Sequence, residues 1–85
     1  MIDLSKIEMT RNYLGGMSFD THATREYSYE ITNTKLKGTK IRHSIYTPKI
    51  NDFEWGEQEN EYWIEGKEEK KYKKLKELIV ALNEA

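Results

Sequence analysis

The sequence predicts an α+β fold, in which an antiparallel meander sheet of about four to five strands carries one C-terminal amphipathic helix packed on one face. Two observations lead to this prediction. Apolar and polar residues alternate along much of residues 7–64, as in strands with one buried face. The segment after Gly66 instead places apolar residues at helical spacing. With 85 residues and no linker-like stretch, the chain is expected to form one small domain spanning residues 1–85.

The sheet is expected to begin with a hairpin. Alternation over residues 7–13 predicts the first strand, although Arg11 interrupts its apolar face. Gly15-Gly16 follows and predicts a tight turn, because both residues can take the positive φ angles that such a turn needs. Alternation resumes over residues 17–21 and is clean over residues 25–34. The pattern leaves open whether these two segments form one bent strand or two strands.

The middle of the chain predicts a turn and two further strands. Gly38 is the expected positive-φ residue of the turn. Residues 39–46 alternate again, and Pro48 is expected to end this strand because a prolyl nitrogen cannot donate to the ladder. Residues 50–60 are then expected to form a polar connection, and residues 62–64 a short last strand.

The C-terminal helix is expected to begin at Gly66 as the N-cap, with Glu68 and Glu69 at the positive end of the helix dipole. Its apolar residues fall on one arc of the helical wheel: Tyr72, Leu75, Leu78, Ile79 and Leu82. The sheet face expected to receive this arc consists of Tyr27, Tyr29, Ile31, Ile41 and Ile45.

Charge is unevenly distributed although the net charge is only −1. Residues 1–50 and residues 70–85 each carry +3, whereas residues 51–69 hold eight acids and one lysine, a balance of −7. Such segregation favours a binding surface of one sign. The alternative is that oppositely charged blocks face one another on a solvated surface, where ion pairs contribute little to stability.

We expect a partner-binding surface on the acidic block or on the sheet face that the helix leaves open, and the sequence does not decide between the two. Aromatic and arginine side chains are frequent anchors of protein interfaces, and carboxylates give such a surface its preference for a basic partner. The predicted binding residues are Arg42, Tyr46, Glu54, Trp55, Glu57, Glu59 and Trp63. In a competing interpretation, Phe53 and Trp55 fold back over Trp63 as a small satellite core.

The leading functional hypothesis is therefore a non-enzymatic module that binds a protein partner with a basic surface. The alternative is a single-stranded nucleic-acid binder that uses Tyr46 and Trp63 for stacking and Lys40 and Arg42 for phosphates. A pI of about 6.1 favours the first hypothesis, because nucleic-acid-binding domains usually carry a basic footprint.

The sequence contains no motif that predicts catalysis, metal binding or cofactor binding. The chain has no cysteine, and it contains neither a phosphate-binding glycine loop nor a nucleophile elbow. Asp20, His22 and His43 are metal-ligand types, but their spacing is unspecific. His43 stands between Ile41 and Ile45, so a core histidine with satisfied hydrogen bonds is the preferred interpretation. We expect no enzymatic activity, no cofactor and no metal.

A cytoplasmic protein that does not enter a membrane is expected. Residues 1–6 lack the apolar stretch of a secretory signal, and the longest apolar run, residues 78–82, is far shorter than the roughly 20 residues that span a bilayer. Lysine outnumbers arginine by eleven to three, which suggests an AT-rich genome. Together with the short chain, this suggests a phage or mobile-element accessory protein that inhibits a host or defence factor. The sequence does not indicate the oligomeric state.

Overall fold

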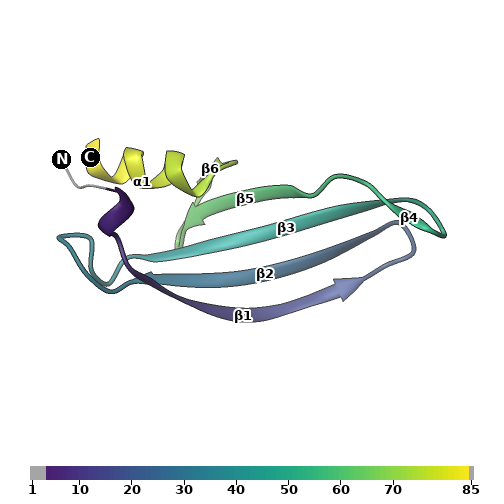
Figure 1. The fold of residues 1–85 in the computed structure, drawn as a ribbon, viewed down its shortest axis with the longest axis horizontal. Coiled ribbons are helices and arrows are strands. Elements are labelled where there is room, and N and C mark those ends of the chain that lie inside the picture. Colours follow the sequence, from purple (N-terminus) through teal and green to yellow (C-terminus); the bar gives the residue numbers. More distant parts are fainter. Residues whose placement is uncertain (1–3, 85) are drawn as a thin grey trace.

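The computed structural model describes residues 4–84 and consists mainly of one long antiparallel sheet (Figure 1). Its elements are the 3₁₀ turn η1 (Leu4–Lys6), the strands β1 (Met9–Ser18), β2 (His22–Ile31), β3 (Lys40–Asn51), β4 (Glu54–Trp55), β5 (Glu59–Ile64) and β6 (Lys67–Tyr72), and the helix α1 (Leu75–Glu84). The strand order is β1-β2-β3-β5-β6, and the short β4 pairs with β3. The predicted antiparallel meander with one C-terminal helix is therefore confirmed.

The Gly15-Gly16 pair does not form the predicted turn but lies within β1 as part of a β-bulge. The register shifts between Tyr13 and Gly15, and Gly15 takes a φ of 138° that favours glycine. The chain instead reverses after Ser18, where the Phe19 N–H donates to the His22 carbonyl at 2.7 Å. The bulge lengthens β1 by accommodating one extra residue, so the second segment of alternation continues the first strand.

β2 and β3 confirm the predicted alternation, and β3 extends beyond its predicted end. Gly38 turns the chain between them with the expected positive φ of 92°. Pro48 does not end β3, because the Lys49 N–H makes the bond toward β2, donating to Thr21 at 3.0 Å. The Pro48 carbonyl points the opposite way and accepts from Gly56 at 2.7 Å. The prolyl nitrogen thus costs the β2–β3 ladder no hydrogen bond.

The C-terminal helix is shorter than predicted because residues 67–72 form a strand. Gly66 is not an N-cap but turns the chain between β5 and β6 with a φ of 88°. β6 then pairs with β5, and α1 begins only at Leu75. Tyr72 packs against the same core from a strand, which explains why its position fitted the helical pattern.

The core occupies one end of the sheet. Ile31 and Ile41 pack there against Leu78 and Ile79 of α1, and all four side chains are buried. A ten-residue helix is about 15 Å long, whereas the molecule extends 46 Å along its longest axis. Figure 1 shows α1 over one end of the strands, while β4 and the β1–β2 turn lie far from it. More than half of the helix-side face is therefore left uncovered.

Candidate functional site

The two faces of the sheet differ in charge. Directly paired residues of antiparallel strands project to the same face, so the register assigns each side chain of β1, β2, β3 and β5 to one face. The face opposite α1, here called the open face, carries four carboxylates and two cations: Glu26, Glu30, Glu59, Glu61, Lys40 and Arg42. The helix-side face of these four strands carries no carboxylate and three cations: Arg11, Arg25 and Lys49.

Four of the predicted binding residues meet in a shallow hollow of about 570 Å³ on the open face. They are Arg42, Tyr46, Glu59 and Trp63. The charged neighbours that also line it are Glu26, Glu61, Glu68 and Lys71. Carboxylates outnumber cations four to two around this hollow, as expected for a surface that attracts a basic group.

Trp63 forms the buried floor of the hollow. The Lys71 ammonium lies 4.8 Å from the centre of the indole ring and 3.5 Å from a carboxylate oxygen of Glu61. A cation therefore already occupies the face of this tryptophan, in the geometry of a cation–π contact. Covering by Lys71 explains how a tryptophan remains buried on a face that no other element covers.

The rest of the predicted surface lies elsewhere, at the end of the sheet farthest from α1 (Figure 1). Glu54 and Trp55 form β4, and Glu57 follows in the connection to β5. Trp55 is 49% exposed and Phe53 is 95% exposed, so neither covers Trp63. The predicted satellite core does not form, because pairing of Trp55 with Lys49 of β3 directs the indole to the helix-side face.

His43 is the centre of an aromatic row on the helix-side face. Its ring stacks on Tyr62 at 4.0 Å, and the row continues through Tyr27 at 5.9 Å. The ring is 6% exposed, with Nε2 2.8 Å from the Asn60 amide oxygen and Nδ1 3.2 Å from the Tyr29 hydroxyl. Since the amide oxygen can only accept, Nε2 carries the proton and Nδ1 accepts from the hydroxyl. The predicted core histidine is confirmed.

Burial shifts the ionisation of His43 and Tyr62 toward their neutral forms. Desolvation lowers the pKa of His43 below its usual value, outweighing the hydrogen bond that the ring donates to Asn60, and Arg11 adds to the lowering. Desolvation also raises the pKa of Tyr62, with a smaller contribution from Tyr29. His43 and Tyr62 are therefore neutral groups at the boundary between the core under α1 and the uncovered half of the same face.

The metal-ligand types in the sequence are not brought together. The His22 ring stacks on Phe19 with centroids 4.6 Å apart, and its Nδ1 lies 2.8 Å from the Thr21 hydroxyl. His43 is engaged in its own hydrogen bonds. Within residues 4–84, no group of three or more His, Asp or Glu side chains is arranged to hold a metal ion. In the same part of the chain, no helix has the length and apolar character needed to cross a membrane.

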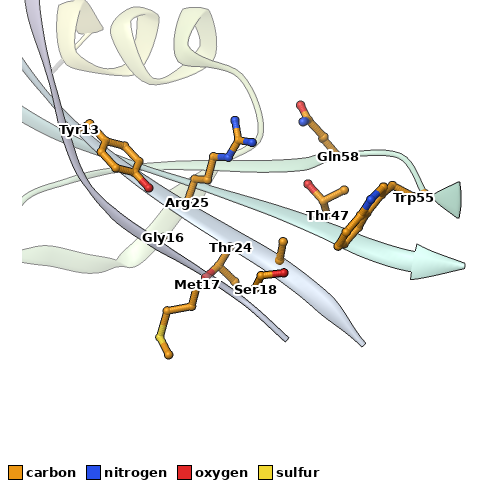
Figure 2. Close-up of a pocket in the computed structure, with 11 residues that line it drawn as sticks. Tyr13, Gly16, Met17, Ser18, Thr24, Arg25, Thr47, Trp55 and Gln58 are labelled. Carbon is orange, nitrogen blue, oxygen red and sulfur yellow. The ribbon is translucent and has the colours of Figure 1, made fainter. Parts of the chain in front are cut away.

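A second hollow, of about 600 Å³, was missed by the sequence analysis (Figure 2). It lies on the uncovered half of the helix-side face, and Tyr13, Arg25 and Trp55 are among the residues that line it. Figure 2 shows Arg25, Thr47 and Gln58 projecting to the side on which α1 lies. A signal was present in the sequence, because the cations Arg11 and Arg25 occupy positions that alternation assigns to the apolar face.

Comparison with models of protein families, with curated proteins and with solved structures finds no match for this chain.

Proposed function

We propose that this protein is a small non-enzymatic binding module that occupies a basic surface of a protein partner, as a phage or mobile-element inhibitor of a host or defence factor would. The observation that carries the proposal is the hollow of the open face, where four carboxylates and two cations surround the exposed ring of Tyr46, above the buried Trp63. An exposed aromatic side chain within a charged rim is a common arrangement at the centre of protein interfaces.

The same hollow gives less support to a nucleic-acid site built on Tyr46, Trp63, Lys40 and Arg42. Trp63 is buried beneath Lys71, so its ring is not available for a base to stack on. Glu59 and Glu61 lie on the same face and would repel a phosphate backbone. A basic protein surface is therefore the partner that this face favours.

The proposal is tested by capture of partners with matched charge variants. In the first, Glu59→Gln, Glu61→Gln and Glu68→Gln remove carboxylates from the hollow. In the control, Asp52→Asn, Glu54→Gln and Glu57→Gln remove the same number of carboxylates from the same acidic segment but outside the hollow. Tagged wild type and both variants are used to capture proteins from an extract of the native host, and mass spectrometry identifies what each one retains.

We expect a partner that the wild type and the control retain and the hollow variant loses. With the purified partner, the hollow variant should bind more weakly and with a flatter dependence on salt, because electrostatic attraction has been removed. Melting temperatures of the three proteins should agree closely, since exposed carboxylates contribute little to stability. Equal retention by both variants would show that the hollow is not the working surface.

A further inference from the structure

The uncovered half of the helix-side face combines cations with exposed aromatic rings. Arg25 and Lys49 lie on this half, and Arg11, one row nearer α1 opposite Tyr29, reaches its edge through the Tyr27 ring. β1, β2, β3 and β5 place no carboxylate on the helix-side face. The Arg11 guanidinium lies 5.0 Å from the ring centre of Tyr27, and the Lys49 ammonium lies 5.7 Å from that of Trp55. Each pair presents a positive charge beside a flat ring, the combination that binds a nucleic-acid backbone together with its bases.

Two of the rings are accessible at opposite ends of this surface. Tyr13 is 62% exposed on the edge strand β1, and Trp55 is 49% exposed on β4. Tyr13 also continues the aromatic row, with its ring centre 5.4 Å from that of Tyr27. Both rings line the same hollow, whose other lining groups include the hydrogen-bonding side chains of Thr47 and Gln58.

Gly16 has no side chain and therefore leaves space beside Tyr13 on this surface. A Cβ atom at position 16 would lie 2.9 Å from the Tyr13 hydroxyl and 2.5 Å from the Thr24 carbonyl. The absence of a side chain therefore leaves room for the tyrosine to lie along the sheet. The bulge that begins after Tyr13 places this glycine opposite Arg25, next to the cation of the hollow.

The dimensions suit a short single strand. His43 and Lys49 are six residues apart along β3. At the rise of a β-strand, the cross-strand rows that contain them are about 20 Å apart. Bases stacked at about 3.4 Å would place roughly six nucleotides over this length. The carboxylates of the open face lie on the other side of the sheet from these cations. Because the side chains of each face extend over about half the spacing of stacked sheets, the two sets of charges are about 10 Å apart. Salt at about 0.1 M screens charges over that distance.

We propose that the uncovered half of the helix-side face binds single-stranded nucleic acid, through stacking on Tyr13 and Trp55 and through phosphate contacts from Arg11, Arg25 and Lys49. This site is separate from the acidic hollow of the open face, and it does not depend on the protein partner proposed for that hollow. The two faces would then bind ligands of opposite charge.

The test is fluorescence anisotropy of the full chain with labelled oligothymidylate and oligouridylate of about ten nucleotides, at salt concentrations from about 50 to about 200 mM. We expect dissociation constants of about 1–100 μM. Three phosphate contacts on a single strand predict a slope of log K against log salt of about −2. A DNA duplex of the same length should bind more weakly, because its bases cannot stack on the protein.

Matched variants assign the site. Tyr13→Ala and Trp55→Ala should each weaken binding about 5- to 100-fold, whereas Phe53→Ala, which removes a still more exposed ring outside the hollow, should leave it unchanged. Arg25→Gln should weaken binding and reduce the magnitude of the salt slope by about 0.7. Arg42→Gln, which removes the same charge from the other face of the next strand, should have no comparable effect.

Three results would overturn this proposal: no binding at about 50 mM salt, a duplex that binds as tightly as the single strand, or equal losses in Arg25→Gln and Arg42→Gln. Melting curves establish that each variant is folded, and Tyr13 and Trp55 are exposed enough for truncation to be tolerated. The triple glutamine variant of the open-face hollow should bind the single strand at least as tightly as the wild type. The two proposals can therefore fail independently.

Discussion

The small core under α1 makes the stability of this protein sensitive to a single truncation. Leu78 is fully buried there, and it packs with Ile31, Ile41 and Ile79 in the one cluster of buried apolar residues found within residues 4–84. Leu78→Ala removes its contacts with the helix and with the sheet and leaves a cavity. The expected loss in the free energy of unfolding is about 2–5 kcal/mol. An 85-residue domain has a free energy of unfolding of about 4–13 kcal/mol, so a large share of the stability is lost.

Thermal and urea unfolding followed by circular dichroism measure this loss. A destabilisation of this size should lower the melting temperature by at least about 10 °C in a domain of this length. Val80→Ala is the control, because Val80 lies on the same helix but is exposed. It should cost less than about 1 kcal/mol. If Leu78→Ala melts within about 3 °C of the wild type, α1 does not hold the sheet end together as described.

Two further predictions follow from the contacts described. Because burial lowers the pKa of His43, the unfolded state takes up a proton first, and the free energy of unfolding should fall as pH drops below about 6.5, by up to about 1.4 kcal/mol per pH unit. Urea titrations between pH 7.5 and 5.5 measure this, and His43→Phe should flatten the dependence; equal slopes in both proteins would refute it. In a Trp55→Phe background, which leaves Trp63 as the one tryptophan of the sequence, Lys71→Ala should uncover Trp63 and shift its fluorescence emission to the red. The free energy of unfolding should fall by less than about 1 kcal/mol. Lys70→Ala, which removes the ammonium beside Tyr72 instead, should not shift the emission.

Local alternation predicted the positions of strands well but not their ends. Residues 25–34 and 39–46 correspond to β2 and to the first part of β3, with the expected side chains turned toward α1. Strand ends depend on whether a neighbouring backbone is available to pair. β3 passes Pro48 because its ladder to β2 continues through Lys49, and residues 67–72 form β6 because β5 offers a partner. Neither circumstance is visible in a local pattern.

The candidate site was partly predictable. Arg42, Tyr46, Glu59 and Trp63 meet on the open face because they alternate on two paired strands, and their spacing in the sequence indicated this. Glu54, Trp55 and Glu57 lie apart from them because the β3–β4 hairpin carries them to the far end of the sheet. The second hollow was missed because helix-side positions were expected to be covered, so Arg11 was treated as an interruption of the apolar face and the position of Arg25 on that face was not considered.

The sequence by itself determined the fold class, the positions of the main strands and the face of each strand, because side-chain alternation has a period of two residues and is readable locally. Only the tertiary structure decided which surfaces remain open. α1 begins eight residues later than expected from a Gly66 cap, so it covers one end of the sheet and leaves the other exposed. Among β1, β2, β3 and β5, the register then places all four carboxylates, two from β2 and two from β5, on one face and none on the other. Helix reach and cross-strand register both depend on residues distant in the sequence, which is why composition alone did not reveal the two oppositely charged faces.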